Sequence, residues 1–159
     1  MADARVLNVT HRSDDLWIAH WGNVCFVTWR AKPTVESATA MARHYLTLAR
    51  QHPRGFFTFG TIEANVPNPD EAARKAISAA MDSVEKHLLA SAVAVEGTGF
   101  AVAALRAALA TMSMLTRARF PRKFFADVDA AAAWMAKGWP ELGDAPSIVS
   151  AFSEFRAKR

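Results

Sequence analysis

The turn Glu96-Gly97-Thr98-Gly99 has the residue types best suited to binding chemistry. It follows an apolar run that predicts a strand and precedes a run that predicts a helix. The N–H groups at the start of a helix, together with its positive dipole end, can hold a phosphate or a carboxylate, and Thr98 adds a hydroxyl. Ligands also gather at the carboxyl ends of strands in open α/β sheets. A tight turn capped by threonine is the common explanation of such a pattern in α/β proteins, and a ligand- or partner-binding site is the functional interpretation that we carry forward.

This turn does not match the nucleotide-binding motifs. The third glycine position of a dinucleotide fingerprint is occupied by Val102, and no Gly-Lys-Ser/Thr follows as in a P-loop. A second candidate is Glu63, which follows another predicted strand. The nearby carboxylates Asp70 and Glu71 are explained by a helix start. Glu63 has no such explanation, and we assign it to the predicted site as a ligand for a cation or a polar group.

No metal site, cofactor or catalytic residue is predicted. His44 and His52 are eight residues apart, too far for ligands one helical turn apart, and the other histidines (His11, His20 and His87) show no metal spacing either. Each histidine is expected at the surface or at a boundary. The single cysteine, Cys25, lies in an apolar run and is expected to be a buried small hydrophobe. An enzyme built around Glu63 and Thr98 is only the third hypothesis for this chain.

Hydrophobic periodicity predicts an α/β domain with a mixed sheet. Three strands come first, with a Gly22-Asn23 hairpin and a polar turn over residues 11–15, so the sheet begins as an antiparallel meander. Strands and about four helices then alternate, which implies a parallel remainder. The expected strands are 6–10, 16–20, 24–30, 55–62, 89–95 and 123–126, and the expected helices are 34–50, 68–88, 100–115 and 128–137.

Local signals set the ends of these helices. Asn68 is expected to cap the second helix, and Asp127 the fourth, which Gly138 should stop. The stretch from Thr98 to Leu115 is the longest apolar segment, but Arg106 interrupts it. A core helix explains this stretch better than a membrane span does.

Aromatic residues suggest an interface. Trp17, Trp21 and Trp29 fall in the predicted meander, and strand alternation places some aromatics on each face of the sheet. Residues 139–159 form a tail beyond the α/β domain of residues 1–138, and Phe152 and Phe155 continue one helical face there. Either a dimer partner or this tail is expected to cover the second sheet face. These five aromatics are the predicted interface, and an ordinary hydrophobic core is the alternative interpretation.

Composition narrows the class of protein. The formal net charge of +4 is spread along the 159 residues, and the one basic run, Arg117, Arg119, Arg122 and Lys123, is interpreted as a solvated loop. No nucleic-acid partner is therefore expected. The N-terminus lacks a signal-peptide pattern and a lone cysteine permits no intrachain disulfide, so a soluble cytoplasmic protein is expected.

Two stretches, residues 92–100 (AVAVEGTGF) and 123–135 (KFFADVDAAAAWM), carry a resemblance to a known family. With the element order, they resemble the STAS-like, SpoIIAA-like domains, whose founding members are bacterial anti-sigma factor antagonists and the tails of sulfate transporters. The resemblance covers roughly residues 5–138. Those antagonists carry a phosphorylatable serine after the third core strand, whereas residues 62–70 contain no serine or threonine. The phosphorylation switch is therefore not carried over.

The resemblance and the lack of catalytic motifs together suggest a non-catalytic regulatory or protein-interaction module, with a protein partner or a second copy as its ligand. The alternative is a carrier of a small apolar or lipid-like molecule, because STAS-like domains are similar in outline to CRAL-TRIO lipid-binding domains. An anionic ligand at the glycine turn remains compatible with either function.

Overall fold

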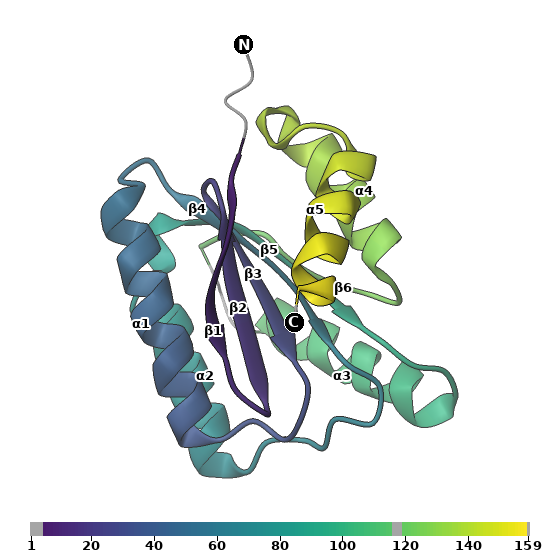
Figure 1. Cartoon of the computed structure of the whole chain (residues 1–159). Coiled ribbons are helices and arrows are strands. Elements are labelled where there is room, and N and C mark those ends of the chain that lie inside the picture. Colours follow the sequence, from purple (N-terminus) through teal and green to yellow (C-terminus); the bar gives the residue numbers. More distant parts are fainter. Residues whose placement is uncertain (1–4, 116–118, 159) are drawn as a thin grey trace.

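A computed structural model of the chain describes residues 5–115 and 119–158. Within these residues, six strands form one sheet, and helices cover both of its faces (Figure 1). The strands are β1 (Leu7–Arg12), β2 (Leu16–Trp21), β3 (Val24–Trp29), β4 (Phe56–Ile62), β5 (Leu88–Val95) and β6 (Arg122–Phe125). The helices are α1 (Val35–Gln51), α2 (Glu71–Asp82), α3 (Phe100–Leu115), α4 (Val128–Gly138) and α5 (Ala145–Ala157), with short 3-10 turns at Glu85–His87 and Pro140–Leu142.

The strand order in the sheet follows the order in the sequence, β1-β2-β3-β4-β5-β6. β1, β2 and β3 pair antiparallel, and β3 through β6 pair parallel. The predicted hairpin is present, and Gly22 adopts the positive φ of +59° that favours glycine there. The predicted α/β class, with an antiparallel meander leading into a parallel sheet, is confirmed.

Each face of the sheet has its own core. Met41, Tyr45 and Leu48 of α1 and Met81 of α2 pack on one face, and α4 and α5 pack on the other (Figure 1). β4 lies between these layers, with six of its seven residues buried, as its continuous apolar run predicts. Cys25 is fully buried in the first core, as predicted, and burial raises the pKa of its thiol.

The predicted tail contains a packed helix, α5. Phe152 of α5 contacts Phe26 and Phe59, with ring centroids 5.3 and 5.2 Å apart. Phe152 is 1% exposed and Phe155 is fully buried, so the predicted apolar face of this segment covers the second sheet face from within the chain. Trp29 is buried too. Trp29, Phe152 and Phe155 therefore belong to the core of this chain, which is the alternative interpretation that the sequence left open for them.

Three boundary predictions are corrected. Asp70, rather than Asn68, caps α2 by accepting a hydrogen bond from the N–H of Ala73 at 2.8 Å. α2 then ends at Asp82 instead of continuing to residue 88. β1 runs through His11 and Arg12, which were expected in a turn, because the turn is made by Ser13 and the residues after it. Asp127 caps α4 as predicted, whereas Gly138 is its last residue.

The basic run is only in part a solvated loop. Arg117 lies outside the described residues, while Arg119 and Lys123 are exposed. Arg122 instead begins β6 and is largely buried, with its guanidinium 5.1 Å from the centroid of Phe124. The run therefore continues into the sheet. No helix among the described residues is long and apolar enough to cross a bilayer.

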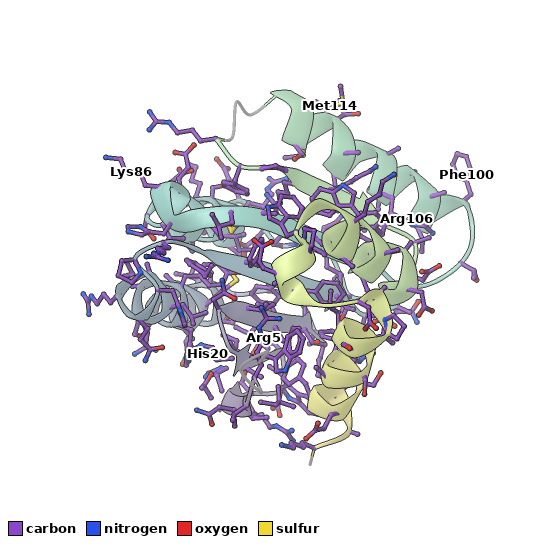
Figure 2. All side chains as sticks on the ribbon, turned by 90° about the horizontal axis from the view of Figure 1, so that it is seen from above. Arg5, His20, Lys86, Phe100, Arg106 and Met114 are labelled. Atoms are coloured by element: carbon purple, nitrogen blue, oxygen red, sulfur yellow. The ribbon has the colours of Figure 1, made fainter. Side chains whose placement is uncertain are left out.

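α3 is the largest departure from the sequence prediction. It has the predicted bounds, but it is not a core helix, because none of its described side chains is fully buried and it packs mainly on the edge strand β6. Phe100 is 91% exposed and Met114 is 85% exposed. Figure 2 shows both side chains pointing away from the body of the protein. The sequence predicted the helix correctly and its environment incorrectly.

Candidate functional site at the carboxyl ends of the parallel strands

Glu63 and Glu96 follow neighbouring parallel strands. Glu63 comes directly after β4, and its N–H bonds to the carbonyl of Trp29 at 2.9 Å. Glu96 comes directly after β5, and its N–H bonds to the carbonyl of Ile62 at the same distance. These bonds continue the ladder by one residue, so both carboxylates leave the same edge of the sheet. The structure thus brings together two residues that the sequence assigned to one site.

Arg156 of α5 joins the two carboxylates. Its Nη1 lies 2.7 Å from Oε1 of Glu96, and its Nη2 lies 3.5 Å from Oε1 of Glu63. Arg30, which follows β3, places its Nε 3.4 Å from the same Glu63 oxygen. Two carboxylates therefore meet two guanidinium groups, and their formal charges cancel. The side chains remain between 27% and 38% exposed, so water screens the pairs.

An aromatic side chain extends this cluster across the sheet. The guanidinium carbon of Arg30 lies 4.1 Å from the ring centroid of Trp17, and that of Arg12 lies 4.3 Å from it. The indole N–H of Trp17 donates to the carbonyl of Ser13 at 3.1 Å. Trp17 is half-buried, so it retains the exposure that a contact residue needs. Trp21 is half-buried as well, and it stacks on Phe26.

The glycine turn lies beside this cluster. Gly97 has a φ of +113°, and a Cβ there would lie 3.3 Å from Val102 and 3.4 Å from Ala64. The backbone conformation therefore favours glycine here, and an added Cβ would be tight only against Val102. Thr98 and Gly99 are exposed, and the helix begins with a bond from the N–H of Ala103 to the carbonyl of Gly99.

Arg106 reaches back from α3 to the same turn. Its Nη2 is 3.5 Å from the carbonyl of Gly97, at the limit of a hydrogen bond, and its buried Nε has no partner among the described residues. The turn therefore offers the exposed hydroxyl of Thr98 beside the cation of Arg106. The carboxylates of Glu63 and Glu96 already form ion pairs with arginines. These ion pairs connect α5 to the strand ends, and they hold the turn from which α3 begins.

Three histidines form a cluster that sequence spacing did not predict. The ring of His44 on α1 lies 5.7 Å from that of His11 on β1 and 5.7 Å from that of His20 on β2. Burial, together with His44 and His52, lowers the pKa of His20 to about 4. Its Nε2 is buried without a hydrogen-bond partner in the described part of the chain. The signal that would have found this cluster is the continuation of β1 through His11.

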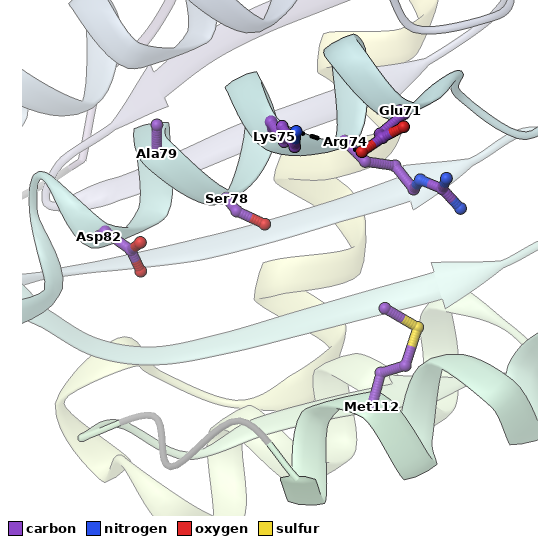
Figure 3. Close-up of a pocket in the computed structure, with 7 residues that line it drawn as sticks. All are labelled: Glu71, Arg74, Lys75, Ser78, Ala79, Asp82 and Met112. Atoms are coloured by element: carbon purple, nitrogen blue, oxygen red, sulfur yellow. Dashed lines mark ion pairs between the residues drawn. The ribbon is translucent and has the colours of Figure 1, made fainter.

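Within residues 5–115 and 119–158, no group of three histidine, cysteine, aspartate or glutamate side chains is arranged to hold a metal ion. A groove of about 400 Å³ lies between α2 and α3, with Met112 facing α2 across it (Figure 3). It is open, and Glu71, Arg74, Lys75 and Asp82 contribute to its wall. The wall of the groove is therefore mixed, with charged side chains of α2 beside the apolar side chains of Ala79 and Met112.

Comparison with protein-family models, curated proteins and solved structures found no significant match to this chain.

Proposed function

We propose that this protein is a non-catalytic interaction module of STAS-like type, and that its partner contacts α3 and the turn before it. The observation that carries this proposal is the exposure of α3. A helix that is apolar all round is normally buried, whereas here the side chains of Phe100 and Met114 project into solvent. Exposure of a large apolar side chain forgoes about 1.5–3 kcal/mol of burial free energy. A partner that covers α3 would recover it.

Glu63, Glu96 and Cys25 are occupied structurally in this fold. Arg156 and Arg30 neutralise Glu63 and Glu96, and the Cys25 thiol is buried with a raised pKa. These features favour recognition over catalysis. The ion-pair cluster then serves as a support, because it holds the Glu96-Gly97 turn from which α3 starts. The STAS-like resemblance remains part of the proposal, through the element order and the two stretches that carry it.

The carrier function finds less support. Its ligand would need an apolar cavity, and the groove between α2 and α3 is open and charged on the α2 side. We therefore keep the interaction module as the single proposal.

Site-specific photo-crosslinking in living cells tests this proposal. A photoreactive phenylalanine analogue replaces Phe100, and in the control it replaces Leu46, an exposed apolar residue on α1. We expect a discrete protein adduct from the first position, lost when Ala107→Glu is added, and no adduct from the second. If both positions give the same diffuse products, α3 is not a recognition surface.

A further inference from the structure

α3 carries two apolar stripes on opposite sides. Val102, Leu105 and Leu109 are half-buried toward the sheet edge. A second stripe, the outer stripe, recurs at spacings of three and four and is exposed at every position: Phe100, Ala103, Ala107, Ala110 and Met114. Residues at these spacings lie on one side of a helix. The stripe of Val102, Leu105 and Leu109 already packs within this chain. The outer stripe is uncovered, so we look for its partner in another molecule.

The outer stripe is complementary to itself. Its two bulky residues are at the ends, fourteen positions or about 21 Å apart along the helix, and its inner positions are all alanine. We infer that a second copy of this chain covers it, with the two α3 helices antiparallel about a two-fold axis at Ala107. Phe100 then packs against Met114 of the partner subunit, and alanine meets alanine between them. Alanines let helix axes approach to about 8 Å.

Charge favours the antiparallel direction. The outer stripe carries no charged side chain, and residues 97–126 contain five basic residues and no acidic one. Four of those bases, Arg117, Arg119, Arg122 and Lys123, follow α3 in the sequence. Antiparallel pairing separates the two basic ends by about 24 Å, well beyond a Debye length of about 8 Å. Antiparallel pairing also opposes the two helix dipoles.

A membrane surface fits α3 less well. A helix that lies in a lipid interface has one apolar face and one face rich in lysine or arginine. The one charged residue of α3 is Arg106, which turns back toward Gly97. The exposed positions between Phe100 and Met114 are mostly alanine, which gains little from insertion.

The strength of the pairing follows from its area. Stable dimers bury about 800 Å² on each partner, and one helix face of about 24 Å gives less than that. We therefore expect a reversible dimer with a Kd in the micromolar range. This inference rests on the proposed function, because it identifies the partner of the same α3 surface.

Cysteine cross-linking of the purified full chain tests the pairing. Cys25 is buried, so a new cysteine on α3 is the one exposed thiol in the described part of the chain. We expect Ala107→Cys to form a disulfide dimer under mild oxidation at least tenfold faster than Ala101→Cys, an exposed α3 position off the outer stripe. Phe100→Cys and Met114→Cys should each stay monomeric alone, and should cross-link when the two proteins are mixed.

The outcomes separate the inference from the proposed function. Equal rates for Ala107→Cys and Ala101→Cys, or no cross-link in the mixture, would overturn the antiparallel pair. If that happens while Phe100 still gives an adduct with a different protein in cells, the inference fails and the proposed function stands. Binding of the chain to anionic vesicles in place of dimer formation would likewise overturn the second copy as the occupant. If the chain forms no dimer, gives no protein adduct in cells and binds no vesicles, both the antiparallel pair and the proposed function are wrong.

Discussion

Arg156 and Glu96 are 60 residues apart in the sequence, yet Nη1 of the arginine lies 2.7 Å from Oε1 of the glutamate. This contact connects the last helix of the chain to the end of β5, immediately before the turn that starts α3. The same guanidinium reaches Glu63 at the end of β4. One side chain therefore links the C-terminal helix, two strand ends and the base of the proposed recognition helix.

Replacing Arg156 should weaken this connection measurably. Arg156→Gln leaves two half-exposed carboxylates with only Arg30 nearby, and we expect a loss of about 0.5–1.5 kcal/mol in the free energy of unfolding. Lys158→Gln is the matched control, because Lys158 pairs with Glu154 on the exposed side of the same helix. It should change stability by less than about 0.5 kcal/mol. Urea denaturation of both variants measures the difference, and equal effects would mean that the cluster is not structural.

Substitution by alanine should lower the free energy of unfolding strongly at Phe152 and hardly at all at Phe100. Phe152 is 1% exposed among other aromatic rings, so Phe152→Ala should cost about 3–5 kcal/mol. Phe100 is 91% exposed, so Phe100→Ala should change the stability of the monomer by less than about 0.5 kcal/mol. Thermal and urea unfolding at low protein concentration distinguish them. A large loss from Phe100→Ala would show that α3 is buried in the isolated chain.

The histidine cluster predicts an acid-sensitive fold. The pKa of His20 is about 4 in the folded protein, against an ordinary value of 6.5, so the folded state holds fewer protons than the unfolded state between these values. Stability is then full above about pH 6.5 and falls as the pH drops toward 4. The groups that act on His20 and His44 are His11, His52 and Arg43, which offer no compensating negative charge.

Replacing one imidazole tests this pH dependence. We expect His20→Phe to reduce the loss of stability between pH 7 and pH 5 by on the order of 1 kcal/mol, after allowing for the partial exposure of His20. His87→Gln, outside the cluster, should leave the loss unchanged. Chemical denaturation at the two pH values makes the comparison. A slope that is the same in wild type and His20→Phe would remove His20 as its cause.

Replacing Gly97 by alanine should destabilise the fold, whereas the same change at Gly138 should not. At Gly97 the φ of +113° is unfavourable for an L side chain, and the added methyl would lie 3.3 Å from Val102. Gly97→Ala should therefore cost about 1–3 kcal/mol. Gly138 ends α4 with no atom within 4 Å of an added Cβ, so Gly138→Ala should be neutral or stabilising by up to about 1 kcal/mol. Denaturation midpoints decide it, and a neutral Gly97→Ala would show that the turn can adopt another conformation.

The sequence predicted most of the fold because its signals are local. Thr34 and Asp127 cap their helices, and Gly22 turns the hairpin, through contacts within a few residues. The cap of α2 was misplaced because Asn68 and Asp70 flank the same proline, and both residue types can cap a helix.

Only part of the candidate site could be predicted, because its other contacts are not local in the sequence. Glu63 and Glu96 stand out as polar residues at strand ends, whereas Arg156 and the histidine cluster depend on packing between distant elements. The sequence also shows that α3 is apolar without showing which molecule covers it.

Sedimentation velocity of the wild-type chain beside Ala107→Glu tests most directly whether α3 pairs with a second copy. The concentrations run from about 1 µM to about 200 µM, a range that spans a micromolar Kd. Ala107 is exposed in the middle of the outer stripe, so the substitution should leave the monomer folded. We expect the wild type to shift from monomer to dimer across this range, and Ala107→Glu to weaken the association at least tenfold. A wild type that stays monomeric throughout, or a dimer that Ala107→Glu does not affect, would contradict this pairing.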